Sequence, residues 1–369
     1  RYCEEKAFIS GNCLYSANAL PKNAHSFQPN AHLPALVPFA WHEIERSTHA
    51  MGHASKGCSM KIKRWCMLGA VLVGTLLASG CSLPAVQHPA SVQLPEPDAP
   101  SELSVAIEQM RARDRADDSD SGIYALTDAQ EAFAARALLA RAAQHSLDVQ
   151  YYIWRADKTG RLLLNELLMA ADRGVQVRLL LDDLGTAGLD AELLALNAHP
   201  HVQVRLFNPF VLRGSFKLLG FVTEFNRTNQ RMHNKSWTAD RQASIVGGRN
   251  VGNEYFGATD GILFSDLDVI TLGPVVQDIA QDFERYWRNA AAYPVEQVVT
   301  RAHDLSLEGL RKQGQTLMQA PASMEHRQAI ASTPFVQQML ATTLPLEWAK
   351  AHLVSDPPEK IQARHKLTP

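Results

Sequence analysis

The alternation of two hydrophobic periods between residues 147 and 206 constrains the fold of this chain most. Three stretches carry apolar residues at every second position, which is the period of a strand: Leu147–Ile153, Val175–Leu181 and Val202–Leu206. Leucines at helical spacing lie between them, from Thr159 to Gly174 and from Gly188 to Asn197. Strands that alternate with helices through short links form a sheet covered by helices. The sequence therefore predicts an α/β fold built on a mixed sheet.

Further elements are expected on both sides of this stretch. Thr127 and Gln130 form a capping-box pattern, which predicts a helix that runs to about Ala143. The other expected elements are a short helix at Leu103–Arg113, strands at Ala243–Val246 and Leu263–Leu272, helices at Pro274–Asn289, Leu305–Met318 and Phe335–Leu340, and a strand-like run at Trp348–Val354.

A His-Lys-Asp set at His233, Lys235 and Asp240 carries the clearest chemistry. Residues two apart on an extended segment face the same way, so His233 and Lys235 are expected to point together towards one phosphate. An imidazole can attack phosphorus and carry a covalent phosphoryl group, while an ammonium offsets the charge that develops on the oxygens. We expect Asp240 to hold the strand and Lys235 rather than to touch substrate.

Residues that follow this set extend the predicted site. Gly247 and Gly248 let backbone approach a phosphate closely, and Asn250 can donate to an oxygen or fix the loop. A nucleophilic imidazole also needs a carboxylate that sets its tautomer, and Asp266 and Asp268 are the local candidates.

Other polar and aromatic residues nearby receive structural interpretations. The pair Asp182-Asp183 is expected to be a turn at the end of a strand, with cation binding as the alternative. Tyr151, Tyr152 and Trp154 are expected to pack in the core and at its rim. The scheme needs no metal or cofactor, and the sequence has no HExxH or CxxC spacing.

The N-terminal quarter of the chain has the features of a secreted protein. Residues 60–80 carry a basic head, an apolar run and a small-residue site before Cys81, as a signal peptide does. Residues 1–59 show no helical or strand period, and we interpret them as a disordered upstream extension that is not part of the working protein. Residues 81–120 are rich in proline and predict a tether.

Several sequence blocks resemble the phospholipase D superfamily, in its bacterial cardiolipin synthase C-type branch. They are Ser146–Trp154, Thr159–Leu164, Ala171–Gly185, Arg231–Asp240 and Gly247–Gly257, in the same order and spacing. The resemblance implies phosphatidyl transfer through a phosphohistidine at His233, with Asp266 orienting the nucleophile. It also implies an anionic phospholipid substrate at a membrane. Gly248 stands where many relatives have Ser, and Cys81 resembles a lipoprotein acylation site.

The family normally carries a second His-Lys-Asp set, and no second set occurs in this sequence. The resemblance therefore assigns residues 121–290 to a first phospholipase D-like domain, 291–345 to a helical connector and 346–369 to the start of a second half. In the family the second His protonates the leaving alcohol, so we expect little or no transferase activity from these residues alone. A lipid anchor at Cys81 would place the protein in a bacterial cell envelope facing the periplasm, with the outer membrane favoured.

Two alternative functions remain open at this stage. One is a phosphodiesterase or nuclease with a single set, completed by homodimerisation. The other is a lipid-anchored fragment that binds headgroups without catalysis. Basic residues exceed acidic ones between Arg205 and Arg249, which would suit DNA, but Phe207, Phe210 and Phe216 interleave them and favour a lipid interface. No nucleic-acid partner is expected.

Overall fold

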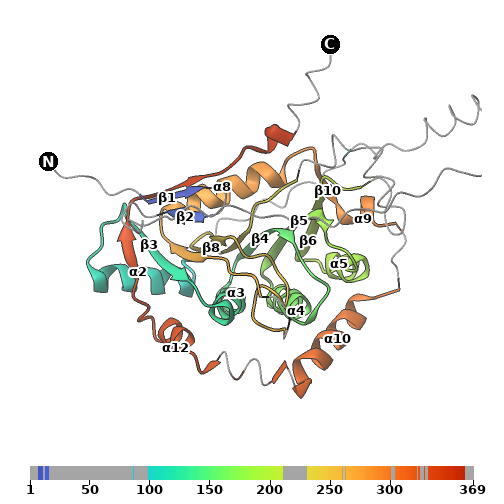
Figure 1. The fold of residues 1–369 in the computed structure, drawn as a ribbon, viewed down its shortest axis with the longest axis horizontal. Helices are drawn as coiled ribbons and strands as arrows, with labels where there is room; N and C mark the ends of the chain where they lie inside the picture. Colours follow the sequence, from blue (N-terminus) through green and yellow to red (C-terminus); the bar gives the residue numbers. More distant parts are fainter. Residues whose placement is uncertain are drawn as a thin grey trace, which may run out of the picture. The chain divides into compact units, whose positions relative to one another are not determined.

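A nine-stranded mixed sheet organises the chain in the computed structural model (Figure 1). The structure describes residues 86, 99–210, 231–259, 261, 263–300, 304–321, 323–324, 328 and 331–361, and the backbone of two strands at 7–10 and 13–15. The strand order is β10-β6-β5-β4-β7-β8-β9-β3-β11. The strands are β3 (Ser121–Leu126), β4 (Ser146–Ile153), β5 (Gln176–Gly185), β6 (Val202–Phe207), β7 (Ser236–Ala239), β8 (Ala243–Gly247), β9 (Asp268–Leu272), β10 (Ala292–Pro294) and β11 (Glu347–Ala349).

The sheet is parallel in one part and antiparallel in the rest. β4, β5 and β6 are parallel to one another, as strands joined by helical crossovers are. β7 pairs antiparallel with β4, and β8, β9, β3 and β11 continue the antiparallel part. This arrangement confirms the predicted α/β class. A smaller sheet of β1 (Ala7–Ser10), β2 (Cys13–Tyr15) and β12 (Ala351–Val354) accompanies it.

Helices cover both faces of the large sheet (Figure 1). Leu147, Val149 and Tyr151 of β4 face the core shared with α3 and α4. On the other face, Leu180 and Phe207 pack against α8. The helices named here and below are α2 (Glu102–Asp114), α3 (Ala129–Ala142), α4 (Lys158–Asp172), α5 (Asp190–Asn197), α8 (Val275–Trp287), α9 (Val295–Val298), α10 (Leu307–Gln319) and α12 (Pro334–Leu340).

Several details differ from the predicted elements. Asp128, not Thr127, caps α3, because its carboxylate accepts from the N–H groups of Gln130 and Glu131 at 2.8 and 3.0 Å. The strand expected from Leu263 begins only at Asp268, and Leu263 and Phe264 are exposed. The run at 348–354 divides into β11 and β12, which lie in different sheets. Strand β3 was not expected.

The polar face of β4 is buried rather than solvated. Asp148 and Gln150 are each 1% exposed because α8 covers them. The Arg178 guanidinium binds both oxygens of Asp148 at 2.7 Å and reaches Glu284 of α8 at 2.6 Å. A buried charge needs such partners, so this ion pair is what allows a polar residue in a central strand.

Most predictions for the N-terminal region lie outside the described residues. These are the signal peptide at 60–80, Cys81, most of the 1–59 extension, and residues 82–85 and 87–98 of the tether. The described parts are the short strands β1 and β2 and, in the tether, helix α2, which matches the expected helix. In the described part of the chain, no helix is long and apolar enough to cross a membrane.

Candidate active site

His233 and Lys235 lie together at the entrance to β7, as the sequence predicts. The Lys235 ammonium nitrogen is 3.1 Å from Nδ1 of His233 and 2.7 Å from the His233 carbonyl oxygen. The His233 side chain is exposed, whereas Lys235 is buried. An ammonium can only donate, so Nδ1 accepts and holds a lone pair in this arrangement. The site thus presents an accessible imidazole backed by a positive charge.

The surroundings of His233 keep its ring neutral at pH 7. Partial burial lowers the pKa of His233, the Lys235 ammonium lowers it further, and the Asp266 carboxylate acts in the opposite direction. A neutral imidazole is the form that can act as a nucleophile. The electrostatics therefore suit attack rather than proton donation by this residue.

Tyr152 forms one wall of the site, which the sequence analysis missed. Its ring centroid is 4.6 Å from that of His233, and the Lys235 nitrogen lies 5.7 Å from the Tyr152 ring centroid. Burial raises the pKa of Tyr152, which keeps the phenol protonated. Tyr151 and Trp154 are fully buried, so their predicted core role is confirmed. The signal for Tyr152 is its place at the end of β4, on the face that Gln150 shares.

The chain on either side of His233 is fixed by buried polar contacts. Gln150 donates to the sulfur of Met232 at 2.9 Å, and Asn234 donates to Asp282 of α8 at 3.1 Å. Lys235 is followed at once by β7, which is paired on both edges with β4 and β8. His233 therefore stands on a rigid support, which a catalytic group needs.

Asp240 lies at the other end of β7. The four residues of β7 lie between it and Lys235, which makes five steps of ~3.3 Å, about 16 Å in all. Its carboxylate accepts from the backbone N–H groups of Gln144, His145 and Ser146 at 3.0, 2.8 and 2.9 Å. The expectation that Asp240 holds a strand agrees with these bonds, and that strand is β4. The expectation that it also holds Lys235 is wrong, because β7 lies between the two residues. This position separates Asp240 from the chemistry at His233.

The two glycines and Asn250 support the loop after β8. A Cβ atom on Gly247 would lie 2.5 Å from the Asp268 Cα and the Leu267 oxygen, and one on Gly248 would lie 2.7 Å from Asp266 Oδ1. Asn250 accepts from the Ile153 N–H and donates to the Tyr255 hydroxyl, each at 3.1 Å. Of its two predicted roles, the geometry supports fixing the loop. Phosphate binding at Gly247 and Gly248 stays a prediction.

The structure gives different roles to Asp266 and Asp268, the two carboxylates that could orient His233. Asp268 is fully buried and binds Arg136 at 2.8 Å and the Arg249 N–H at 3.1 Å, so it stabilises the core. Asp266 is partly exposed, lies beside Gly248 and acts electrostatically on His233. Asp266 is therefore the carboxylate that remains available to the imidazole.

Asp182 and Asp183 do not form the predicted turn at the end of a strand. Both lie inside β5, which continues to Gly185, and both are 0% exposed. Their oxygens accept from neighbouring backbone N–H groups. Among the residues that the structure describes, no group of three or more His, Cys, Asp or Glu side chains is arranged to hold a metal ion.

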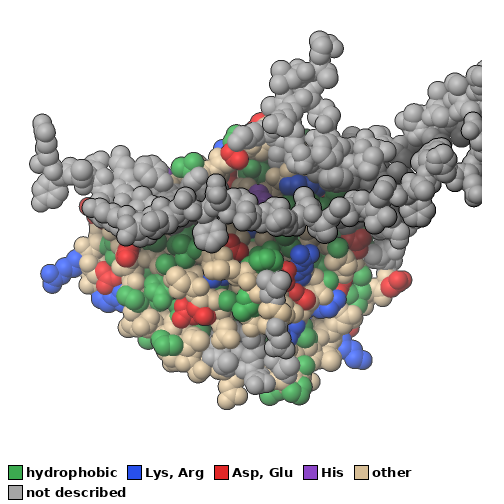
Figure 2. Space-filling view, in the orientation of Figure 1, with side chains coloured by type: hydrophobic (Ala, Val, Ile, Leu, Met, Phe, Trp, Pro, Cys, Tyr) green, Lys and Arg blue, Asp and Glu red, His purple; other side chains and the backbone are tan. Residues whose placement is uncertain are grey.

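The basic excess between Arg205 and Arg249 is not an exposed patch in the described part of that segment. Arg205 and Arg249 are each 2% exposed and donate to the carbonyl oxygens of Trp287 and Leu126. On the face drawn in Figure 2, acidic, basic and apolar side chains are interspersed. The described residues of this face therefore form no continuous basic surface of the kind that binds nucleic acid.

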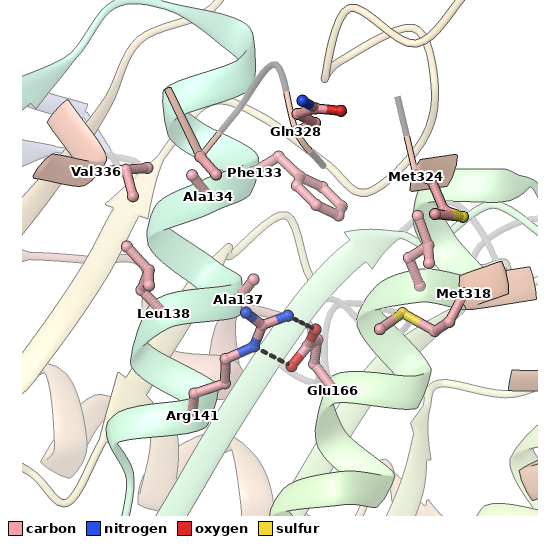
Figure 3. Close-up of a pocket in the computed structure, with 12 residues that line it drawn as sticks. Phe133, Ala134, Ala137, Leu138, Arg141, Glu166, Met318, Met324, Gln328 and Val336 are labelled. Atoms are coloured by element: carbon pink, nitrogen blue, oxygen red, sulfur yellow. Dashed lines mark hydrogen bonds and ion pairs between the residues drawn. The ribbon is translucent and has the colours of Figure 1, made fainter. Parts of the chain in front are cut away.

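A separate cavity of about 380 Å³ lies beside α3 and α4 (Figure 3). Apolar side chains, including Phe133, Met318 and Val336, line most of it. Its charged residues, Arg141 and Glu166, bind each other, with Arg141 Nε 2.9 Å from Glu166 Oε2. These two charges neutralise each other. The cavity also lies on the opposite face of the sheet from α8, whereas the residue after His233 binds α8. We therefore place the candidate site at His233.

Comparisons with known proteins point to one family. The family described as "Cardiolipin synthase, PLD-like domain" matches residues 137–287, which contain every predicted site residue except Cys81. Cardiolipin synthase C of Escherichia coli (strain K12) is 48% identical over 258 residues, covering 67% of this chain and 53% of that protein. A cardiolipin synthase of Staphylococcus aureus (strain Mu50) is 33% identical over 179 residues, covering 47% of this chain and 33% of that protein.

Among solved structures, the phospholipase D family member Nuc from Salmonella typhimurium matches with a TM-score of 0.35 and 14% identity. This match covers 47% of the chain and 97% of Nuc. The chain spans about half the length of the cardiolipin synthase C that it matches.

Proposed function

Because the chain belongs to the phospholipase D superfamily, in its cardiolipin synthase-type branch, we propose that its described domain supplies the nucleophilic half of a phosphatidyl-transfer site. The observation that carries this proposal is the exposed, neutral His233 with the Lys235 ammonium 3.1 Å from its ring. The substrate is an anionic phospholipid at a membrane surface, and the acceptor is the hydroxyl of a second lipid.

The reaction begins with attack of the His233 lone pair on the phosphorus of a phosphodiester. The bond from phosphorus to the leaving alcohol breaks, and a phosphatidyl-histidine forms. Lys235 moves from Nδ1 towards the non-bridging oxygens, where it offsets their developing charge. Asp266 offsets the positive charge that the imidazole acquires. The acceptor hydroxyl then attacks the same phosphorus, and the phosphorus–nitrogen bond breaks to release neutral His233. The hydroxyl proton returns to the group that protonated the leaving alcohol.

Departure of an alkoxide requires a proton donor. We assign no such donor among the described residues, and a second His-Lys-Asp set would supply one. We therefore expect residues 1–369 alone to turn over natural lipids slowly or not at all. We also expect that a substrate whose leaving group departs without being protonated will still react with His233.

The test uses bis(p-nitrophenyl) phosphate, because p-nitrophenolate departs without being protonated. The whole chain should release a burst of p-nitrophenolate equal to the protein concentration and gain one p-nitrophenyl phosphoryl group on His233, measured by peptide mass. His233→Ala should show neither. His352→Ala removes another exposed histidine, on β12, and should behave as the unaltered chain. A burst that survives in His233→Ala contradicts the proposal.

A second experiment separates lipid from nucleic acid. The chain and His233→Ala are incubated with vesicles of labelled phosphatidylglycerol and, separately, with plasmid DNA. Slow lipid turnover that is lost in the variant supports the phosphatidyl-transfer site. DNA cleavage that is lost in the variant supports a homodimeric nuclease instead. Headgroup binding without either reaction, together with no burst in the first experiment, supports a binding fragment.

We also propose that Cys81 carries a lipid anchor and that the protein faces the periplasm. Metabolic labelling with a radioactive fatty acid should mark the chain in bacteria but not the Cys81→Ser variant. Equal labelling of both would refute acylation at this residue.

A further inference from the structure

Two adjacent buried carboxylates on β5 fasten the chain on both sides of residues 211–230. Asp183 Oδ2 accepts from the Phe210 N–H at 2.8 Å, where the chain has left β6. Asp182 Oδ2 accepts from the Met232 N–H at 3.0 Å, one residue before His233. Both carboxylates are 0% exposed. Neighbouring positions of one strand thus hold the two ends of the segment that leads to the nucleophile.

Arg231 joins these two ends directly. Its Nη1 donates to Asp182 Oδ1 at 3.2 Å and to the Asn208 carbonyl oxygen at 3.0 Å. Its guanidinium carbon lies 4.4 Å from the centroid of the Phe210 ring. Arg231 therefore links the residues before the segment to those after it, and Asp182 anchors this link to the sheet.

We propose that Asp182 and Asp183 form a clamp that positions His233, with Asp182 as the positioning residue for the nucleophile. This inference rests on the proposed function, since it assigns Asp182 a role in the same reaction. The clamp fixes the backbone one residue from His233, and consecutive Cα atoms are ~3.8 Å apart. A fixed backbone at that point leaves the imidazole little freedom except rotation about its own side-chain bonds. Misplacement of a reacting group by about 1 Å can cost ~100-fold in rate.

The energetics favour positioning over packing as the reason for a carboxylate here. Burial raises the pKa of Asp182 to about 7, although Arg231 and the N–H groups of Leu184 and Met232 oppose the shift. Ionised Asp182 is thus costly to bury, and apolar residues of similar size often replace a buried ion pair without loss of stability. The hydrogen bonds that Asp182 makes to the His233 segment are what an apolar residue could not provide.

Asp148 offers a matched control for this inference. It forms a buried ion pair with Arg178 in the same sheet, with side chains 1% and 4% exposed. Arg178 lies on β5, four residues before Asp182, about 13 Å away at ~3.3 Å per residue. Asp148→Asn therefore weakens a comparable buried pair without touching residues 231–233.

The test compares Asp182→Asn with Asp148→Asn in the whole chain. Asn keeps the shape of Asp182 but turns an amide N–H or a weaker acceptor towards Arg231. We expect the rate constant of the p-nitrophenolate burst to fall at least ~10-fold in Asp182→Asn with KM within about twofold. Asp148→Asn should lower the unfolding midpoint and leave the burst unchanged. A burst at the unaltered rate in Asp182→Asn, or an equal fall in both variants at equal stability, overturns the clamp.

Two further measurements keep the inference testable if the chemistry or the folding fails. Hydrogen exchange of the Met232 amide should be faster in Asp182→Asn than in Asp148→Asn, and the NMR titration of His233 should shift. Arg231→Lys keeps the positive charge but lacks the planar fork that binds two acceptors, so it should show the same changes if Asp182→Asn does not fold. No burst in the unaltered chain refutes the proposed function, whereas unchanged Met232 exchange and His233 titration in a folded variant refute the clamp.

Discussion

Substitution of Asp240 tests whether the third residue of the His-Lys-Asp set takes part in the reaction or stabilises the fold. The structure places its carboxylate against the N–H groups of Gln144, His145 and Ser146, at the start of β4. Asp240 also has a left-handed backbone, with φ of 50°. Asp240→Ala removes the acceptor and puts alanine in a backbone region that it disfavours. We predict a loss of stability with little change in the reactivity of His233.

The magnitude follows from these contacts. A hydrogen bond to a charged group contributes about 1.5–3 kcal/mol, but Gln144 is exposed and His145 partly exposed, so water can replace the carboxylate there. Only Ser146 is buried, so the three bonds together contribute about 2–4 kcal/mol to the free energy of unfolding. The left-handed residue adds about 1 kcal/mol. The expected loss in Asp240→Ala is thus about 3–5 kcal/mol in total.

Asp240→Asn is the matched control, because asparagine tolerates the left-handed region and keeps one acceptor oxygen. Its loss should be less than half that of alanine. Urea denaturation at 25 °C measures both free energies, and the p-nitrophenolate burst is measured below the unfolding transition. A folded Asp240→Ala with its free energy of unfolding unchanged and its burst abolished would refute the structural role.

Three other predictions concern the same region. Gly247→Ala should destabilise the fold by about 3 kcal/mol or more, because its Cβ meets backbone of the paired strand. Gly248→Ala meets only the Asp266 side chain, which can move, and should cost about 1 kcal/mol or less. Equal losses in urea denaturation would contradict this difference. The burst rate should fall as pH decreases through the lowered pKa of His233, because only the neutral ring attacks. A rise towards acid pH would contradict this prediction. Lys235→Met should raise the pKa of His233, since a neighbouring positive charge is removed; an unchanged or lower value in an NMR titration would show that the ammonium does not act on the ring.

The regular elements of the sheet were predictable because each carries its own hydrophobic period. The strands β4, β5 and β6 and the helices between them match the expected ranges within a few residues. Strand β3 was not predictable from its own residues, because its partners are β9 and β11, far away in the sequence. The apolar residues before Asp268 predicted that the strand begins at Leu263. In the structure Leu263 and Phe264 are exposed and belong to no strand, so their apolar character does not mark a buried element.

The candidate site was predictable where local geometry decides it. His233 and Lys235 share a side because they are two residues apart, and the structure brings their nitrogens within 3.1 Å. Tyr152 reaches the same region from β4, and its only local signal is that it shares a face of the strand with Gln150. Asp182 reaches the region from β5, and nothing in its own sequence neighbourhood indicates that. A tandem Asp pair most often marks a turn, so its burial in the middle of a sheet can be found only from the contacts that it makes across the strands.

The His-Lys-Asp set thus combines two physical roles that its sequence spacing conceals. His233 and Lys235 stand at one end of β7 and face a common point, whereas Asp240 stands at the other end and joins β7 to β4. Since β4 also carries Tyr152, the strand that Asp240 fixes is the one that forms a wall of the site. The spacing between Lys235 and Asp240 is therefore the length of one strand, with the nucleophile at one end and the residue that anchors β4 at the other. Insertion of one residue into β7 would turn Lys235 to the opposite face relative to Asp240, so it should abolish the burst even where the fold survives.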